Sequence, residues 1–315
     1  TGAAITPVVR VEDNGNILSK GVDYQGTYSD NVNAGTATVT ITGINIYRGT
    51  QTATFKIMPQ NLGRANVTSI SDQTYDGKEK KPKVVVSSEG LILTQGTDYT
   101  ISYSQNKNPG KASVVIKGKG NFTGLKTVNF NIKVPAVTRV KVSKYTDTSI
   151  TFTWNLNKLF SGYEIYNSSN KKVASVRKKD VNKAKVSNLK AGTAKTFRVR
   201  GYVIKNGDYY YSPFVKIKAS TAPKATKISS LTSKKSKQVV VKWKKIKGAS
   251  SYEIYRSTSK KGTYKKLAST SKTSYTDKKA TKGKTYYYKI RVCKKDKTGT
   301  YYSSYSSIKS VKAKK

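Results

Sequence analysis

Few side chains in this sequence can perform acid–base or metal chemistry. The 315 residues contain no histidine, one cysteine (Cys293) and 16 aspartates and glutamates. Without histidine there is no Ser-His-Asp or Cys-His pair, no His-containing zinc site and no imidazole acid or base. One cysteine excludes a disulfide within the chain and any CxxC metal or redox motif. These observations exclude most hydrolytic, redox and metal-dependent functions.

The acidic residues do not supply a site either. Close acid pairs occur at 12–13 and within 76–79, both near predicted turns and outside any evident cleft, so they do not indicate a glycosidase. The motif DNGN at 13–16 is similar to part of a calcium-binding loop, but its counterpart SEGL at 88–91 is not, and the remaining ligand spacing is missing. We interpret 13–16 as a turn and predict no catalytic residue, no cofactor and no metal.

Lysine dominates the charge. Lysine and arginine total 61 against 16 acidic residues, a net charge of +45, and only nine of the basic residues are arginines. The net charge rises along the chain, from +6 over 1–134 to +14 over 135–221 and +25 over 222–315. A positive end that faces a polyanion would produce this gradient, whereas charge that serves solubility alone would not need one. A solvated basic surface without a dedicated partner remains the alternative.

The lysine runs at 232–237, 260–266 and 276–284 are predicted to lie in loops, where they can reach a partner. Lysine supplies point charge without the fork geometry of arginine, which suits an anionic cell-wall polymer such as teichoic acid, or a sulfated or acidic glycan. Nucleic acid is expected to bind only nonspecifically, because proteins that recognise a nucleic-acid sequence rely on bidentate hydrogen bonds from arginine to the bases, and arginine is scarce here. The candidate polyanion-binding residues are Lys234, Lys235, Lys260, Lys261, Lys265, Lys266, Lys278, Lys279, Lys282 and Lys284.

Tyrosines gather in two predicted hairpins, at 205–214 and 297–305. Exposed tyrosines can stack on sugar rings, but more often they shield a junction between modules, and we keep the second as the default interpretation. If the tyrosines instead stack on sugar rings, the chain would be an adhesin or a carbohydrate-binding segment that engages host mucin or polysaccharide. This is the alternative function. The candidate glycan-stacking residues are Tyr209, Tyr210, Tyr301 and Tyr302.

The first half of the chain repeats itself after 75 residues. GVDYQGTYSDNVNAGTATVTITGINIYRG at 21–49 falls on GTDYTISYSQNKNPGKASVVIKGKGNFTG at 96–124. Apolar residues alternate within each copy, which predicts short antiparallel strands joined by turns. The second copy is preceded by 62–77, and the first copy begins at what would be the last two residues of that segment. We therefore expect a chain cut from a longer protein just inside a module. The first module would then lack an edge strand, and 1–58 would expose a sheet edge that can pair with another chain.

The second half repeats differently. SITFTWN…GYEIYNS at 149–168 matches QVVVKWK…SYEIYRS at 238–257, and AKTFRVRGY at 194–202 matches TYYYKIRVC at 285–293. With a period of two, TYYYKIRVC directs Tyr286 and Tyr288 into the core and Lys289, Arg291 and Cys293 outward; the aligned strand directs Arg198, Arg200 and Tyr202 outward.

The strand beside TYYYKIRVC is predicted to be the YEIY strand, whose glutamate also points outward. Glu253 is therefore expected within about 4 Å of Lys289 or Arg291, as a cross-strand ladder that stabilises the sheet. Glu164 is expected to pair in the same way with Arg198 or Arg200.

This second half resembles fibronectin type III modules. The early-strand tryptophans Trp154 and Trp243, the YEIY strands and LKAGTAKTFRV at 189–199, a version of the tyrosine-corner segment, carry the resemblance. Lys195 stands where the corner tyrosine is expected, whereas Tyr286 fills that place in the other copy, so the corner hydrogen bond is expected only there. The first half resembles the short Ig-like repeats of surface proteins from Gram-positive, gut-dwelling Firmicutes.

Together these patterns predict an all-β fold of four tandem antiparallel β-sandwich modules, two Ig-like and two fibronectin type III-like, joined by short proline-bearing junctions into a semi-rigid rod. The predicted boundaries are 1–58, 59–134, 135–221 and 222–315. The resemblance implies a non-catalytic, extracellular spacer and attachment region of a larger surface or secreted protein, whose parent can carry a catalytic domain upstream. We expect no membrane insertion, because no apolar run approaches the roughly 18 residues that span a bilayer.

Overall fold

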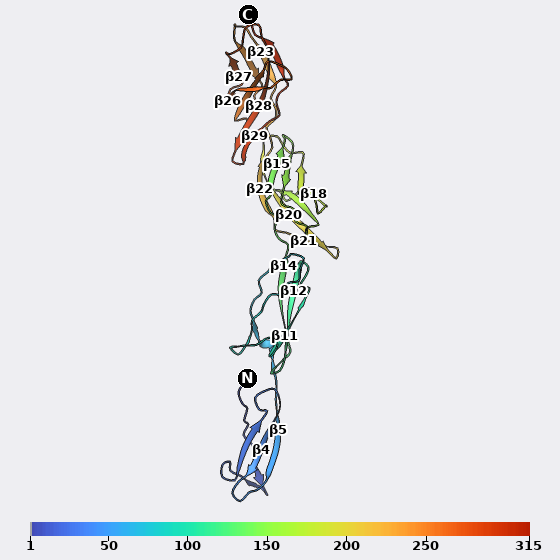
Figure 1. Ribbon diagram of the computed structural model, residues 1–315, viewed down its shortest axis with the longest axis vertical. Helices are drawn as coiled ribbons and strands as arrows, with labels where there is room; N and C mark the ends of the chain where they lie inside the picture. The colour runs from blue at the N-terminus through green and yellow to red at the C-terminus, as the bar shows by residue number, and fades with distance from the viewer. Residues whose placement is uncertain (1) are drawn as a thin grey trace. The chain divides into compact units, whose positions relative to one another are not determined.

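The computed structural model describes residues 2–315, and the only helical element in that part of the chain is a single 3-10 turn, η1 (Leu62–Arg64). All other elements are β-strands, arranged in several sheets (Figure 1). The chain divides into two compact units, Thr1–Lys133 and Val134–Lys315. The predicted all-β fold built from sandwich modules is confirmed.

The first repeat contains one hairpin and one three-stranded sheet. The hairpin pairs β1 (Glu12–Asp13) with β2 (Asn16–Ile17), and the sheet has the order β3 (Tyr24–Ser29), β4 (Gly35–Gly43), β5 (Thr50–Ile57). Asn14 and Gly15 between β1 and β2 have φ angles of 46° and 81°, the positive values of a tight hairpin turn. The interpretation of 13–16 as a turn is confirmed.

The second repeat has the same sheet and adds strands to it. Its four-stranded sheet has the order β11 (Tyr99–Ser104), β12 (Gly110–Gly118), β14 (Leu125–Lys133), β8 (Gln73–Thr74). A second sheet has the order β10 (Leu91–Ile92), β9 (Val86–Ser88), β7 (Asn66–Val67), and β6 (Gln60–Asn61) pairs in parallel with β13 (Phe122–Thr123).

The segment that holds β6, η1, β7 and β8 has no counterpart before the first repeat in the described residues, so β5 pairs only with β4 there. The expectation that the first repeat lacks an edge strand is therefore confirmed.

The two modules of the second unit share one strand order. In residues 135–221 the first sheet has the order β15 (Lys141–Tyr145), β16 (Ile150–Thr153), β19 (Lys183–Val186). The second sheet has the order β18 (Lys172–Val176), β17 (Gly162–Asn167), β20 (Ala194–Lys205), β21 (Asp208–Tyr211), and β22 (Val215–Ser220) also pairs with β20. In residues 222–315 the first sheet has the order β23 (Ile228–Thr232), β24 (Val239–Trp243), β27 (Ser274–Asp277). The second sheet has the order β26 (Lys265–Thr270), β25 (Ser251–Ser257), β28 (Thr285–Asp296), β29 (Gly299–Tyr302), and β30 (Lys309–Lys312) also pairs with β28.

The predicted alternation holds over most of β28. Tyr286 and Tyr288 are 3% and 0% exposed, so two of the three consecutive tyrosines belong to the core. The aligned tryptophans are also buried, and Trp243 packs on Tyr252 with ring centroids 5.5 Å apart. Strand geometry alone therefore accounts for most of this aromatic stretch.

The alternation breaks where β28 and β20 continue into their hairpins. Cys293 and Tyr202 were predicted to face solvent, and this is wrong, because they are 9% and 5% exposed. Tyr202 is covered by the rings of Tyr209 and Tyr211 from β21, at centroid distances of 5.3 and 6.2 Å. Cys293 is a small side chain with a paired strand on each side, β25 and β29.

Candidate functional site

All ten predicted polyanion-binding lysines are exposed. They come from three stretches of sequence: the β23–β24 loop, the β25–β26 loop with the start of β26, and the β27–β28 loop. We call this set of ten lysines the basic end of residues 222–315.

Strand register brings the three stretches to the same end of the module. Asp277, the last residue of β27, lies opposite Val239, the first residue of β24, so the loops that flank these residues are neighbours. Ser257, at the end of β25, lies opposite Tyr287, near the start of β28, which places the β25–β26 loop beside the β27–β28 loop. The antiparallel topology therefore gathers charges that are far apart in the sequence.

The acidic side chains of this module do not compensate the basic end. Residues 222–315 contain three of them, and each is engaged in an ion pair. Asp277 is 2% exposed and accepts from Arg256, while Asp296 pairs with Lys294 at 3.1 Å. Glu253 is bound by Arg291 and Lys266 at 2.6 and 2.5 Å. Most of the exposed positive charge at this end is therefore unpaired within the module.

Two of the ten lysines differ from their prediction in one respect. Lys265 and Lys266 were expected in a loop, but they are the first two residues of β26. The strand extends to them because they pair with Arg256 and Tyr255 of β25. Lys266 is also occupied by Glu253, so it is less available than the others to an external anion.

The predicted cross-strand ladder is present. Arg291 Nε lies 2.6 Å from Glu253 Oε2, and Arg200 donates to Glu164 Oε2 through Nε and an Nη at 3.0 and 2.8 Å. Sequence reasoning missed that each glutamate also binds a lysine from the opposite neighbouring strand, Lys266 in one module and Lys172 in the other. The signal was available, because these lysines occupy the strand that follows each YEIY strand.

An aromatic layer covers this ladder, so the outward glutamates are buried although they lie on the outer face of the sheet. Glu164 and Glu253 are 6% and 5% exposed. Arg291 lies over the ring of Tyr302 at 4.0 Å, and Lys289 lies over Tyr305 at 4.0 Å. These cation–π contacts add to the ion pairs and exclude water from the carboxylates.

The pKa of Glu253 is shifted downward. Burial alone would raise it, but hydrogen bonds from Lys266, Tyr255 and Arg291 outweigh burial and lower the pKa from 4.5 to about 2. The pKa of Glu164 is lowered in the same way, by Lys172, Arg200 and Tyr166 against the effect of burial. Both carboxylates are held ionised, which suits a structural pair and not a general acid.

The four candidate glycan-stacking tyrosines do not form one surface. Tyr301 is 7% exposed, and its ring packs edge-on against Tyr145 of the preceding module at a centroid distance of 5.0 Å. The prediction that Tyr301 is available to a sugar is wrong, because its ring fills the contact between the two modules. This agrees with the default interpretation, in which such tyrosines shield a junction between modules. Tyr302 is half-buried beneath Arg291.

Tyr209 and Tyr210 lie in β21, where Tyr209 is 54% exposed and Tyr210 is half-buried. Sequence reasoning missed Tyr211 as a partner of Tyr209. It is 43% exposed, and the two rings lie 6.1 Å apart with planes 24° apart. Residues two apart on a strand share a face, which was the available signal.

The tyrosine corner occurs where it was expected. Tyr286 Oη accepts from the backbone N–H of Thr281 at 3.0 Å, whereas Lys195, at the aligned position, is exposed. We expect Tyr286→Phe to lower the free energy of unfolding of residues 222–315 by about 1 kcal/mol, the usual contribution of one such hydrogen bond. Urea unfolding measures this loss. The control is Tyr287→Phe on the outer face of the same strand, and equal losses in the two variants would contradict the assignment.

Within residues 2–315, no group of three or more cysteine, aspartate or glutamate side chains is placed to hold a metal ion. In the same part of the chain, no helix is long and apolar enough to cross a membrane.

Comparison with known proteins identifies one family. No curated protein matches the chain. Among solved structures, the chain is similar to a two fibronectin type III domain segment from chicken tenascin, with 22% identity over 56% of this chain and 99% of that chain and a TM-score of 0.32. It is also similar to the FN1–FN3 domains of chicken CNTN1, with 12% identity over 82% of this chain and 100% of that chain and a TM-score of 0.37. Residues 135–217 match the model of the fibronectin type III domain family.

Proposed function

We propose that this chain is a non-catalytic, extracellular spacer and attachment region of a Gram-positive surface or secreted protein, held electrostatically by its basic end to an anionic cell-wall polymer. The observation that carries the proposal is the basic end itself. Ten exposed lysines from three separate stretches converge at one end of a module whose three carboxylates are already paired. The fibronectin type III match over 135–217 supports the spacer part of the proposal, because domains of this family are generally non-catalytic structural modules.

The charge chemistry favours a flexible polyanion over a ligand with fixed geometry. The candidates are all lysines, which act as point charges and impose little orientation. The screening length at physiological ionic strength is about 8 Å, so only anions close to the surface are held and binding falls steeply with salt. Teichoic acid presents repeated phosphates of this kind.

The test is binding of the full chain to isolated Gram-positive walls over a range of salt concentrations. Lys234, Lys235, Lys260 and Lys261 are exposed, and changing all four to glutamine is expected to weaken binding about tenfold, since each exposed pair contributes roughly 0.2–1 kcal/mol. The matched control changes four exposed lysines of the other unit to glutamine, which removes the same net charge: Lys56, Lys83, Lys107 and Lys111.

Removing teichoic acid from the wall should abolish binding, and removing neutral glycan should not. Equal losses in the two lysine variants would show that only net charge matters and would reject the basic end as the attachment site. Equally tight, salt-sensitive binding to any DNA fragment would indicate a nonspecific basic surface instead.

The stacked Tyr209 and Tyr211 favour a second function, that of a carbohydrate-binding segment. Two exposed, nearly parallel rings on one strand can hold a sugar face. This function requires Tyr209→Ala with Tyr211→Ala to abolish binding to mucin glycans while all lysines remain. Unchanged binding in that variant rejects it.

A further inference from the structure

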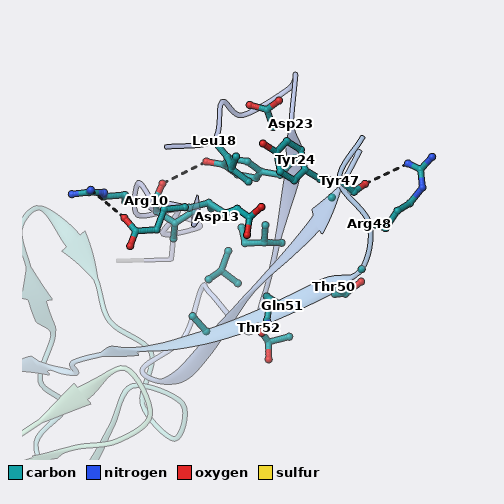
Figure 2. Close-up of a pocket in the computed structure, with 18 of the residues that line it drawn as sticks. Arg10, Asp13, Leu18, Asp23, Tyr24, Tyr47, Arg48, Thr50, Gln51 and Thr52 are labelled. Carbon is teal, nitrogen blue, oxygen red and sulfur yellow. Dashed lines mark hydrogen bonds and ion pairs between the residues drawn. The ribbon is translucent and has the colours of Figure 1, made fainter. Parts of the chain in front are cut away.

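Two pockets of the described residues differ in the sign of their charge. One, of about 840 Å³, opens between the segment that carries the β1–β2 hairpin and the strands β4 and β5 (Figure 2). Its charged lining residues have both signs: Arg10, Arg48, Glu12, Asp13 and Asp23. The other, of about 530 Å³, lies in residues 135–221 and has four basic side chains against one acidic one: Lys158, Arg177, Lys178, Lys179 and Asp180. The second pocket therefore favours an anion, and we call it the basic pocket.

The cations of the basic pocket are free to bind a ligand. The pocket lies between the loop that joins β16 to β17, at 158–161, and the loop that joins β18 to β19, at 177–181. All four basic side chains are exposed. The ion pairs of residues 2–315 all involve other side chains. An external carboxylate or sulfate would therefore not have to displace an internal partner.

Three tyrosines lie beside this pocket on the sheet that contains β20 and β21. Tyr202 of β20 lies opposite Tyr211 of β21 in the strand register. The rings of Tyr209 and Tyr211 are exposed and nearly parallel, and the buried ring of Tyr202 supports both at centroid distances of 5.3 and 6.2 Å. We call these three residues the tyrosine platform. Its two exposed rings offer an apolar face on which a sugar ring can stack.

Tyr202 connects the tyrosine platform to the basic pocket. Gly162 of β17 lies opposite Tyr202, and a Cβ at Gly162 would lie 2.3 Å from the Tyr202 hydroxyl oxygen, so the tyrosine side chain crosses β17 toward β18. Arg177 directly follows β18. Burial raises the pKa of the Tyr202 hydroxyl, whereas the positive charge of Arg177 acts to lower it, which indicates that the guanidinium lies near the hydroxyl. Ser161 of the pocket also accepts from the backbone N–H of Ile204, at the base of the β20–β21 hairpin, at 3.0 Å.

The aligned module of residues 222–315 lacks this arrangement, although it has the same strand order. Cys293 and Thr300 stand at the positions of Tyr202 and Tyr209, as the registers of β28 and β29 show. Ser271, which directly follows β26, stands at the position of Arg177. A module with this strand order therefore folds without the tyrosine platform and without the arginine. The fold does not require these residues, which favours a role in binding.

We infer that the tyrosine platform and the basic pocket together bind an anionic saccharide. The sugar ring stacks on Tyr209 and Tyr211, and its carboxylate or sulfate is held by Arg177 with the lysines beside it. The planar guanidinium can donate to two oxygens of such a group at once. A neutral sugar uses the tyrosine platform alone and binds more weakly. The inference rests on the carbohydrate-binding function proposed above and names the class of sugar, and it does not involve the basic end.

The test is an NMR titration of the full chain, ¹⁵N-labelled, with three sugars that share one disaccharide: lactose, sialyllactose and sulfated lactose. The expected result is that an anionic sugar binds about tenfold more tightly than lactose, because charge-assisted hydrogen bonds are roughly twice as strong as neutral ones. Saturable shifts are expected at the amides of 177–181 and 205–212. Comparison of sialyllactose with sulfated lactose identifies whether a carboxylate or a sulfate is held.

The charge variant changes residues 177–179 to glutamine (Arg177→Gln, Lys178→Gln, Lys179→Gln). It should reduce binding of the anionic sugars to the level of lactose and leave lactose unchanged. The matched control removes the same charge from the other sheet of the same module, by changing three exposed lysines to glutamine: Lys141, Lys183 and Lys185. This control should bind like the unmodified chain. Equal losses in the two variants would show an effect of net charge alone and would overturn the inference.

The variant Tyr209→Thr tests the tyrosine platform with the residue that the aligned module carries, so the fold should tolerate it. It should weaken binding of all three sugars about tenfold, because one of the two stacking rings is lost. Lactose that binds as tightly as the anionic sugars, and is lost in Tyr209→Thr, would overturn the inference and leave the carbohydrate-binding function in place. Failure of all three sugars to bind would overturn both.

Discussion

Replacing Asp277 with alanine is expected to lower the free energy of unfolding of residues 222–315 by about 3–5 kcal/mol, the range for breaking a buried ion pair from one side. Asp277 is 2% exposed and accepts from Arg256 and from the hydroxyl of Tyr288 at 2.7 and 2.8 Å. Its other oxygen accepts from the backbone N–H of Lys279 at 2.9 Å. The substitution leaves three donors without their acceptor. Because Tyr288 is 0% exposed, water cannot readily take the place of the lost carboxylate as acceptor for its hydroxyl.

The preceding module supplies the matched control. At the positions of Asp277, Arg256 and Tyr288 it carries Val186, Asn167 and Phe197, as the strand registers show. The triple variant Asp277→Val, Arg256→Asn, Tyr288→Phe removes both side-chain donors together with the acceptor and leaves only the backbone N–H of Lys279 without its partner. It should be closer in stability to the unmodified chain than Asp277→Ala is, because removing both partners of a buried ion pair costs less than leaving one partner unpaired.

Pulse-labelling hydrogen exchange along a urea series measures these losses module by module. Peptides from β24 and β28 should lose protection at lower urea in Asp277→Ala, whereas peptides from β16 in the neighbouring module report whether the effect is local. If the triple variant is as unstable as Asp277→Ala, the loss comes from packing volume and not from the unsatisfied donors.

Glu253 is expected to make the stability of the same module depend on acid. Its pKa in the folded protein is about 2 against an ordinary value of 4.5. Because the folded pKa is the lower one, the ionised glutamate stabilises the fold fully above about pH 4.5, and this contribution is lost as the pH falls toward 2. Asp296, whose pKa is also lowered to about 2 by hydrogen bonds that outweigh burial, acts in the same direction and window.

Glu253→Gln should therefore lower the free energy of unfolding at neutral pH by on the order of 2 kcal/mol and flatten its dependence on pH between about 4.5 and 2. Urea unfolding at a series of pH values measures both effects. Glu89→Gln is the control, since Glu89 is exposed and lies in the other unit. A variant that loses stability but keeps the full acid dependence would show that Glu253 does not carry the titration.

Much of this protein follows from local sequence pattern. The period of two in TYYYKIRVC correctly placed Tyr286 and Tyr288 in the core and Arg291 against Glu253. The internal repeats correctly indicated sandwich modules and the missing strand of the first repeat. These predictions succeed because the pleat of a strand directs alternate side chains to opposite faces whatever the strand packs against. Lysine positions in loops were mostly right for a related reason, since charged residues rarely tolerate burial.

Only the tertiary structure decided what covers each outward face. Glu253 points outward as the pattern requires, yet it is buried, because rings and lysines from other strands close over it. Cys293 and Tyr301 are buried by a neighbouring strand and a neighbouring module, which no local pattern contains. The convergence of the ten lysines at one end likewise depends on strand register between distant segments. Whether a side chain is buried, and which groups lie near it, depends on residues that are distant in the sequence. The sequence therefore determined the direction of each side chain, and the fold determined its environment.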